Sequence, residues 1–305
     1  MKHQEIGGII PPLVTPFRTD GSIDEQAHRR EVRYMIETAK VHGLAVGGST
    51  GEGHTLTTDE TRRIVAWTVD EAKNRVPVIA GIIANSTQAV LERAHAVADL
   101  GVTALQVTPV HYVFRPDDEA MVKHFAAIAD GSGVPVIIYN VVPWSYLLPA
   151  LLARILREVD GVIGVKQSAS DMKALADLLL LVEEDGSAKN VRILSAVDPL
   201  LYPSFRLGSH GAVAAILSAA PEWCVALWDA VRAGDDAGAL KFHKNLLRVW
   251  NAIDAPNLPA NVRAAMRLHR REGGTPRPPM PASSPVQEAN IRDAFARADE
   301  LIAAV

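Results

Sequence analysis

Eight short apolar segments recur along the chain at intervals of about thirty residues. Each segment except the last is followed by a loop and an amphipathic helical pattern. Segments this uniformly apolar suit parallel strands in a sheet that is covered on both faces. Strand and helix alternating in this way indicate an α/β fold, the (β/α)8 or TIM barrel, whose usual length is about 250 residues. We expect the strands at residues 8–13, 44–47, 76–82, 104–108, 134–139, 162–166, 191–195 and 211–216.

The chain continues beyond what such a barrel needs. We assign residues 1–225 to the barrel and residues 226–305 to a C-terminal helical appendage packed on it. Residues 273–285 are rich in Pro, Gly and Ser, and we interpret them as a loop strapped to the surface. Helical patterns in this part of the chain cover residues 222–233, 235–253, 257–271 and 287–304.

Several predicted helices carry start signals in the sequence. Thr57 and Glu60 have the spacing of a capping box before an apolar-periodic run. Ser86 can cap a helix over residues 87–100, and Asp117 and Asp171 stand at the start of the next predicted helices.

Charge and composition exclude several classes of partner. The net charge of −4 and the pI of about 6.2 give no basic field for nucleic acid or an anionic membrane. No apolar run is long enough to span a bilayer, and no secretory leader is recognisable at the N-terminus. Cys224 is the one cysteine, and we expect it to be a packed apolar side chain in a cytoplasmic protein.

Two other chemistries on this fold lack their motifs. The ten histidines are scattered, and none has another histidine four residues away, as a metal hydrolase would be expected to show. The glycine-rich turn at residues 47–53 does not have the spacing of a phosphate-binding loop or a dinucleotide fingerprint.

In a barrel of this kind the active site lies at the C-terminal ends of the strands. Lys166 ends the apolar strand at residues 162–166. Burial of an amine favours its neutral form, which can attack a carbonyl, although a strand-end lysine can also simply reach solvent. Ser49 and Thr50 lie in the glycine-rich turn and offer hydroxyls and backbone N–H groups to a small carboxylate, unless the turn is only a tight connection. Tyr139 is either a proton relay or an amphipathic core tyrosine.

Three motifs, in this order and spacing, resemble the dihydrodipicolinate synthase/N-acetylneuraminate lyase family of class I aldolases. They are Gly-Ser-Thr-Gly-Glu at residues 48–52, Ile-Tyr-Asn-Val at residues 138–141 and Gly-Val-Lys at residues 164–166. The resemblance extends from residue 13 to the last helices. It implies a homotetramer built as a dimer of dimers, with no metal and no organic cofactor.

The resemblance implies roles for the matching residues. Lys166 corresponds to the lysine that forms an imine with a 2-oxo acid, and Tyr139 to the tyrosine that moves protons at that imine. Ser49 and Thr50, with Gly48 beside them, correspond to the hydroxyl pair next to the carboxylate of the 2-oxo acid.

Further substrate contacts are implied at two other strand ends. Val213 falls where a branched apolar residue lines the imine pocket. The lysine-pathway synthases have paired tyrosines after the fourth strand, where this chain has Val110, His111 and Tyr112. His111 and Tyr112 are therefore the candidates for completing a proton relay there.

Other departures bear on the substrate. The synthases carry an arginine shortly after the Tyr-Asn-Val-Pro segment, where it receives a second carboxylate; residues 139–146 here contain none. The synthases have Glu-Ala-Thr after the lysine, where residues 167–169 read Gln-Ser-Ala. The polar segment that N-acetylneuraminate lyases use for a sugar chain is not evident either. Trp144 and Tyr146 suggest a less polar acceptor pocket.

The leading hypothesis is a class I lyase that forms a Schiff base with pyruvate or another 2-oxo acid. Its partner would be an aldehyde or sugar acid, in aldol cleavage, condensation, or dehydration of a 2-keto-3-deoxy acid. One alternative is 4-hydroxy-tetrahydrodipicolinate synthase itself. An alternative of another class is a catalytically silent paralogue that binds a small acid; the presence of Lys166 and Tyr139 argues against it.

Overall fold

The structure is a computed structural model that describes residues 5–169, 171–186 and 191–303. Within these ranges eight parallel strands form one sheet in the order β1-β8-β7-β6-β5-β4-β3-β2. A parallel bridge between Pro12 and Ala45 joins the segment after β1 to β2 and closes the ring. The predicted (β/α)8 barrel is therefore confirmed. The strands are β1 (Gly8–Ile9), β2 (Leu44–Val46), β3 (Val78–Ile82), β4 (Ala104–Val107), β5 (Val136–Asn140), β6 (Val162–Gln167), β7 (Arg192–Ser195) and β8 (Gly211–Ala212).

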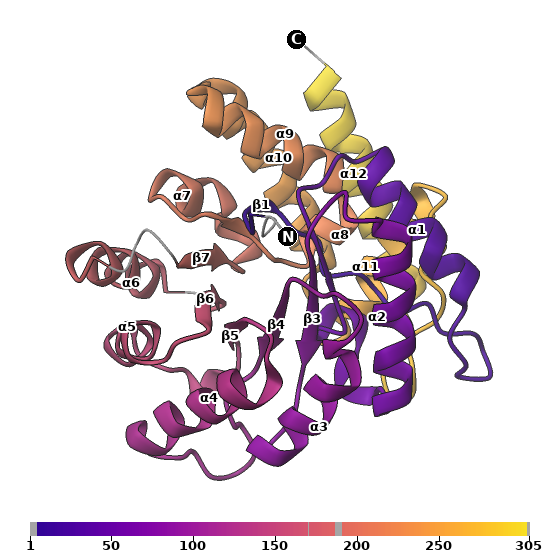
Figure 1. Cartoon of the computed structure of the whole chain (residues 1–305). Coiled ribbons are helices and arrows are strands. Elements are labelled where there is room, and N and C mark those ends of the chain that lie inside the picture. Colours follow the sequence, from indigo (N-terminus) through magenta and orange to yellow (C-terminus); the bar gives the residue numbers. More distant parts are fainter. Residues whose placement is uncertain (1–4, 170, 187–190, 304–305) are drawn as a thin grey trace.

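The helices surround the strands, as Figure 1 shows. Those that follow β1 to β7 are α1 (Glu25–Glu37), α2 (Thr58–Ala72), α3 (Thr87–Ala98), α4 (Asp118–Ser132), α5 (Pro149–Glu158), α6 (Met172–Glu184) and α7 (Leu201–Arg206). Those that follow β8 are α8 (Ile216–Ala219), α9 (Pro221–Ala233), α10 (Asp236–Ile253), α11 (Leu258–Leu268) and α12 (Pro285–Ala303). Short 3-10 turns occur at η1 (Ser49–Gly51), η2 (Gly53–Thr55), η3 (Pro143–Ser145) and η5 (Asp198–Leu200).

The first and last strands are shorter than predicted. The ladder of β1 ends at Ile9, and two prolines, Pro11 and Pro12, follow shortly after it. Proline has no N–H to donate to a ladder, which limits further pairing there. The predicted strand at residues 211–216 ends at Ala212, and its last residue, Ile216, instead begins α8.

The predicted helix starts are confirmed. In α2 the Thr57 hydroxyl accepts from the N–H of Glu60 at 3.1 Å, and the Glu60 carboxylate accepts from the N–H of Thr57 at 3.0 Å. Ser86, Asp117 and Asp171 each accept a backbone N–H from the first turn of α3, α4 and α6. Each cap satisfies a donor that the helix itself leaves unpaired.

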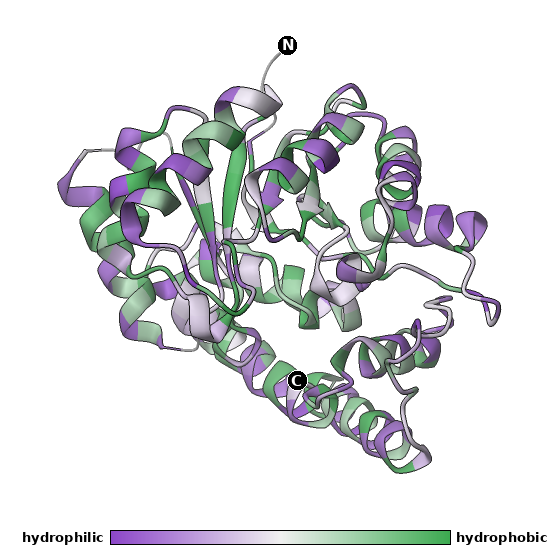
Figure 2. Cartoon of the chain, turned by 90° about the horizontal axis from the view of Figure 1, so that it is seen from below, coloured by the Kyte–Doolittle hydropathy of each residue, from purple (hydrophilic) through white to green (hydrophobic). Residues whose placement is uncertain are grey.

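Two apolar layers hold the barrel. A small cluster fills its interior and includes Ile10, Ile79, Ile137, Leu194 and Val213. A larger cluster fills the space between the strands and the helices. Figure 2 shows the corresponding pattern, with green strands inside and helices that carry purple hydrophilic stripes. Buried on both faces, the strands have the apolar character that made them recognisable in the sequence.

The C-terminal helices pack on the barrel, and α11 lies at the end where the strands finish. Helix α11 contacts α8 and the turn η1, while α10 packs against α9 and α12. The loop at residues 273–285 runs along the surface as predicted: the N–H of Thr275 donates to the carbonyl of Phe17 at 2.9 Å. Helix α9 covers both sides of the expected boundary between residues 225 and 226, so we propose that the barrel unit extends to the end of this helix.

Candidate active site

Strand register places a lysine beside a tyrosine. In the pairing of β5 with β6, Tyr139 stands opposite Lys166 near the C-terminal ends of both strands. The Lys166 Nζ lies 3.7 Å from the centroid of the Tyr139 ring. Both residues are only 4% exposed, and the structure gives the amine no carboxylate partner among the described residues. The amine is thus largely shielded from water, against an aromatic face.

A tightly packed glycine turn brings a hydroxyl to the same point. Gly47, at the end of β2, has a positive φ of 79°, which disfavours other residues. A Cβ on Gly53 would lie 1.8 Å from the Gly47 carbonyl oxygen, so only glycine fits. The compact turn holds Ser49, whose Oγ accepts a hydrogen bond from the Tyr139 hydroxyl at 3.1 Å.

These side chains line one cavity of about 280 Å³ at the C-terminal end of the barrel. Its walls come from strand ends, from the β5–α5 and β6–α6 loops, and from the start of α11 in the C-terminal appendage. The lining residues are Ser49, Thr50, Tyr139, Val141, Tyr146, Lys166, Ser168, Ala196, Asp198, Val213, Ala214, Ala215, Leu258 and Pro259.

The structure brings together five of the residues singled out in the sequence, namely Lys166, Tyr139, Ser49, Thr50 and Val213. The other three do not line the cavity. Gly48 precedes η1 and serves the turn behind it. His111 donates its backbone N–H to Asn85 Oδ1 at 3.2 Å, and Tyr112 is 69% exposed. The loop that carries both runs outward from β4, so neither reaches Lys166 within one chain.

Asp198 is a cavity residue that the sequence reasoning missed. It accepts the backbone N–H of Ile216 at 2.7 Å, which ties η5 to the start of α8. Burial raises the pKa of the Asp198 carboxyl to about 6, although the Ile216 N–H and the nearby Lys166 both act to lower it. The sequence signal that could have identified Asp198 was its position three residues after the end of β7.

The loop after β5 is held in place by hydrogen bonds. The Asn140 side chain donates to the Leu147 carbonyl at 3.0 Å and accepts the Leu147 N–H at 2.9 Å. Tyr146 then points to the cavity and donates its hydroxyl to the Ser168 carbonyl at 3.2 Å. Trp144 instead stays 69% exposed, so of the two aromatic residues only Tyr146 lines the cavity.

Two kinds of feature are absent from the described ranges. No group of three or more His, Cys, Asp or Glu side chains there is arranged to hold a metal ion. None of the helices described is both long enough and apolar enough to cross a membrane. Cys224 is buried, and burial raises the pKa of its thiol, in line with the packing role expected of it.

The chain matches the Dihydrodipicolinate synthetase family over residues 5–297. It belongs to this family. The 4-hydroxy-tetrahydrodipicolinate synthase of Bradyrhizobium diazoefficiens is 36% identical over 95% of this chain and 96% of its own length. The synthase of that name from Methanopyrus kandleri is 34% identical over 90% of this chain and 91% of its own. Among solved structures, YagE, a prophage protein of the dihydrodipicolinic acid synthase family from E. coli, in complex with pyruvate, is 26% identical and has a TM-score of 0.89 over 97% of this chain and 98% of that one.

Family membership identifies the class of chemistry. As a member of the dihydrodipicolinate synthetase family, the chain is a lyase of the class I, Schiff-base-forming type. A buried lysine at the end of β6, beside a tyrosine and a serine hydroxyl, has the composition that such chemistry needs.

Proposed function

We propose that Lys166 forms a Schiff base with pyruvate or a related 2-oxo acid, and that Tyr139 moves the protons of that reaction. One observation carries the proposal: the Lys166 Nζ lies over the ring of Tyr139, whose hydroxyl is hydrogen-bonded to Ser49. A proton can pass along such a chain of hydroxyls without rearrangement of the backbone.

The steps follow from this arrangement. The carboxylate of the 2-oxo acid docks at the turn that carries Ser49 and Thr50. The neutral amine of Lys166 adds to the ketone carbon to give a carbinolamine, whose oxygen takes a proton from Tyr139 and leaves as water. The resulting protonated imine loses a proton from the neighbouring carbon to the Tyr139 phenolate, which gives the neutral enamine and restores the phenol. The enamine attacks an aldehyde carbon, or the same carbon–carbon bond breaks in the reverse direction.

The second substrate is proposed to be an aldehyde or a sugar acid. The segment after Tyr139 has no arginine to receive a second carboxylate, and Tyr146 lies on the acceptor side of the cavity. Cleavage, condensation or dehydration of a 2-keto-3-deoxy acid suits this lining. A second candidate is the 4-hydroxy-tetrahydrodipicolinate synthase reaction, which is favoured by the names of the relatives at 34% and 36% identity.

The first experiment is borohydride trapping with pyruvate, read by peptide mass. We expect a stable reduced pyruvate adduct on the peptide that contains Lys166 and no adduct in Lys166→Met. Lys173→Met, which removes an exposed lysine paired with Asp177, is the matched control and should still be trapped. Absence of an adduct with pyruvate and with longer 2-oxo acids, in folded protein, would refute the Schiff-base proposal.

A screen of acceptors then separates the candidate functions. Pyruvate is supplied with 4-hydroxy-2-oxo acids, sugar-acid aldehydes and the aldehyde substrate of the synthase in parallel. Turnover with the last alone would favour the synthase. An adduct on Lys166 without turnover on any acceptor would favour the silent small-acid-binding paralogue.

We further propose that the enzyme works in the cytoplasm as a homotetramer built as a dimer of dimers. Support comes from apolar side chains that one chain leaves in solvent: Tyr112, Val113 and Phe114 are 69%, 67% and 83% exposed. Patches of this kind often mark protein contacts. Light scattering after gel filtration should give the tetramer mass, and Phe114→Asp should lower it. A monomeric wild-type protein would contradict the proposal.

A further inference from the structure

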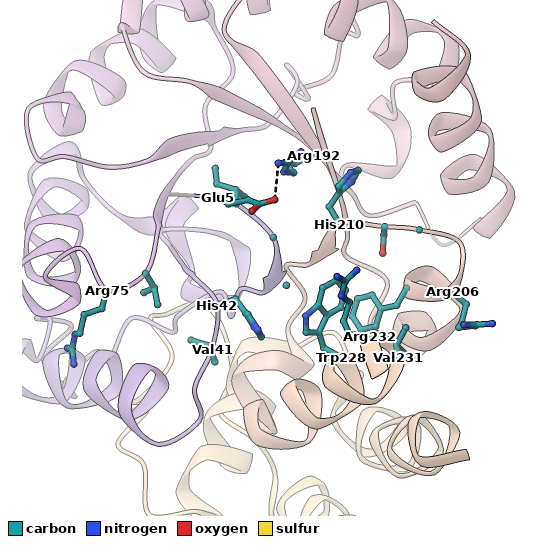
Figure 3. Close-up of a pocket in the computed structure, with 17 residues that line it drawn as sticks. Glu5, Val41, His42, Arg75, Arg192, Arg206, His210, Trp228, Val231 and Arg232 are labelled. Carbon is teal, nitrogen blue, oxygen red and sulfur yellow. Dashed lines mark hydrogen bonds and ion pairs between the residues drawn. The ribbon is translucent and has the colours of Figure 1, made fainter. Parts of the chain in front are cut away.

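A second cavity, larger than the one at Lys166, lies elsewhere among the described residues. It has a volume of about 760 Å³ and opens at the opposite end of the barrel, where the strands begin (Figure 3). Residues just before or at the starts of β1, β2, β3, β7 and β8 line it, together with one face of α9. Its size suits a metabolite, because ligand pockets commonly measure about 300–1,000 Å³.

Two histidines present N–H donors at this cavity. His42 Nδ1 accepts the backbone N–H of Ile9 at 3.2 Å, and His210 Nδ1 accepts that of Ile193 at 3.1 Å. Burial lowers the pKa of both imidazoles, and the accepting Nδ1 of each ring carries no proton, which is the arrangement of a neutral imidazole. A neutral ring whose Nδ1 accepts must carry its proton on Nε2. Neither Nε2 has a hydrogen-bond partner within the described chain, and both residues line the cavity.

Glycines make room for this arrangement at the starts of β1 and β8. Gly8 has a φ of 69°, and a Cβ there would lie 2.5 Å from Cγ of His42. A Cβ on Gly211 would lie 2.2 Å from the Gly8 carbonyl oxygen, so the starts of β1 and β8 can approach closely only as glycines. The two donors are therefore set by the backbone before any ligand arrives, which reduces the entropy lost on binding.

The Ser209 hydroxyl is a third possible donor at the cavity, and it has no hydrogen-bond partner among the described residues. Its side chain lies at the cavity, the residue is 4% exposed, and Oγ is buried without a hydrogen-bond partner. A buried hydroxyl that lacks a partner costs free energy, which a ligand oxygen at this point would recover. The described residues thus provide no acceptor for this hydroxyl.

The charges at the cavity favour an anion. Its lining holds four arginines and one glutamate, an excess of three positive charges. Arg75 and Arg206 are paired with Glu37 and Asp236, which lie outside the lining. Figure 3 accordingly shows their heads at the periphery.

The two remaining arginines are less completely neutralised. Arg192 forms an ion pair with the exposed Glu5 at 3.1 Å, which the dashed line in Figure 3 marks. Arg232 has no carboxylate partner among the described residues, and its guanidinium carbon lies 6.0 Å from the centroid of the Trp228 ring. The guanidinium of Arg232 can therefore turn to a ligand without breaking an ion pair.

One wall of the cavity is apolar. Trp228 packs edge-on against Phe205 at 4.9 Å between ring centroids and against His42 at 6.4 Å. Val41 and Val231 extend this wall (Figure 3). An anionic group held by the donors would thus leave an organic body against the tryptophan.

We propose that this cavity is a binding site for a small organic anion. A phosphate or carboxylate group accepts hydrogen bonds from His42, His210, Ser209 and Arg232, and an aromatic or aliphatic body packs on Trp228. The site is separate from the Schiff-base chemistry, because it lies at the other end of the barrel. It does not depend on the reaction proposed for Lys166.

The test is isothermal titration calorimetry with phenyl phosphate, inorganic phosphate and benzoate at constant ionic strength. We expect saturable binding of at least one of these anions, and binding of phenyl phosphate about fivefold or more tighter than that of inorganic phosphate. The affinity for phenyl phosphate, compared with that for benzoate, shows whether the site prefers a phosphate or a carboxylate group. No saturable binding of any of them up to about 20 mM would overturn the proposal.

Variants locate the binding. Arg232→Met keeps the apolar stem on Trp228 and should weaken binding about fivefold or more, as should Ser209→Ala. Arg154→Met removes the same charge from α5, where Arg154 pairs with Glu119, and should leave binding within about twofold of wild type. Equal binding by all of these proteins would place the anion elsewhere and contradict the site.

Ser209→Ala also separates a ligand contact from a structural role. The hydroxyl has no hydrogen-bond partner among the described residues, so its removal should leave the thermal midpoint of the free protein unchanged or raise it. A structural serine would instead lower that midpoint when replaced. Weaker anion binding with an unchanged or higher midpoint supports the proposal, and a lower midpoint with unchanged binding overturns the role of Ser209.

Discussion

The Tyr139 ring lies against the Lys166 amine and its hydroxyl donates to Ser49 Oγ, so the contribution of that hydroxyl can be measured on its own. Tyr139→Phe keeps the ring under the Lys166 Nζ and removes only the proton-carrying group. Turnover should fall by about a hundredfold or more, while the thermal midpoint changes little. Tyr202→Phe removes a hydroxyl that donates to Asp236 outside the cavity and serves as the control for steady-state kinetics. Turnover of Tyr139→Phe close to wild type would show that another group moves the proton.

Asp198 should leave a signature in the pH dependence of stability. Burial raises the pKa of this carboxyl from 3.8 to about 6 in the folded protein. Between these values the unfolded chain has lost the proton that the folded chain keeps, so rising pH favours unfolding in that window. Thermal midpoints of wild type and Asp198→Asn, measured from pH 4 to pH 7, should diverge in favour of the variant. Parallel curves would mean that the carboxyl titrates normally.

Predicted site residues that belong to a motif lie together in the structure, whereas the positions of residues outside the motifs depend on contacts that the sequence does not show. Lys166, Tyr139 and Ser49 come from separate motifs, yet the barrel brings their side chains to one cavity. Asp198 belongs to no motif, and its place in the cavity depends on the turn that its hydrogen bond to Ile216 makes. His111 and Tyr112 follow a strand end too, but the direction of their loop is decided by contacts such as that with Asn85.

At the scale of elements, a buried ion pair ties the appendage to the catalytic turn. Arg263 of α11 lies 2.6 Å from the Glu52 carboxylate, and both side chains are almost completely buried. The same guanidinium donates to the Thr15 carbonyl at 2.8 Å and to the Gly273 carbonyl at 3.0 Å. Because Glu52 directly follows η1, helix α11 supports the turn that carries Ser49.

Breaking this pair should therefore cost both stability and activity. Arg263→Met leaves a buried carboxylate without its charge partner, which destabilises a protein by about 3–5 kcal/mol. Urea denaturation measures this loss, and kinetics on the folded fraction should show lower turnover. Arg267 also lies on α11 and forms an exposed ion pair with Glu288 of α12. Arg267→Met breaks that pair and should cost under about 1 kcal/mol of unfolding free energy. If both variants lose the same small amount, the link from α11 to the turn is not important for stability.

Helix starts were predictable because they are local. The capping box of Thr57 and Glu60 involves neighbours in the chain, so the residue types suffice. The Arg263–Glu52 pair joins residues more than two hundred positions apart, and nothing in either stretch announces it. Short-range chemistry thus located the elements, whereas their attachment to one another required the structure.

For the whole molecule, the strand–helix period predicted the barrel and its active end, but not the cavity at the other end. That cavity gathers Glu5, His42, Arg192, His210 and Trp228 from five stretches of the chain. The Nδ1 of His210 accepts the backbone N–H of Ile193 in β7. A ligand-binding role for its Nε2 could not be predicted, because most of the other cavity residues are far from His210 in the sequence.

Acid should destabilise the whole molecule through histidines that are buried in neutral form. Burial lowers the pKa of His28 and of His124 from 6.5 to about 4. Between these values the unfolded chain binds protons that the folded chain excludes, so stability falls as the pH drops through this window. The free energy of unfolding lost from pH 7 to pH 5 is on the order of 2 kcal/mol per histidine. The Asp198 carboxyl, whose pKa is raised, acts in the opposite direction.

A double variant isolates the two histidines from the other titrating groups. His28→Gln keeps a donor for Thr68 Oγ1, which accepts from Nε2 at 2.8 Å, and His124→Asn keeps a polar atom for Thr87 Oγ1 at 2.9 Å from Nδ1. Neither replacement titrates, so the free energy of unfolding in urea should fall less between pH 7 and pH 5 than it does in wild type. His54→Gln, at an exposed position, should follow the wild-type profile. If the double variant loses as much stability as wild type, the acid sensitivity arises from other histidines whose pKa is lowered by burial, such as His243 and His269.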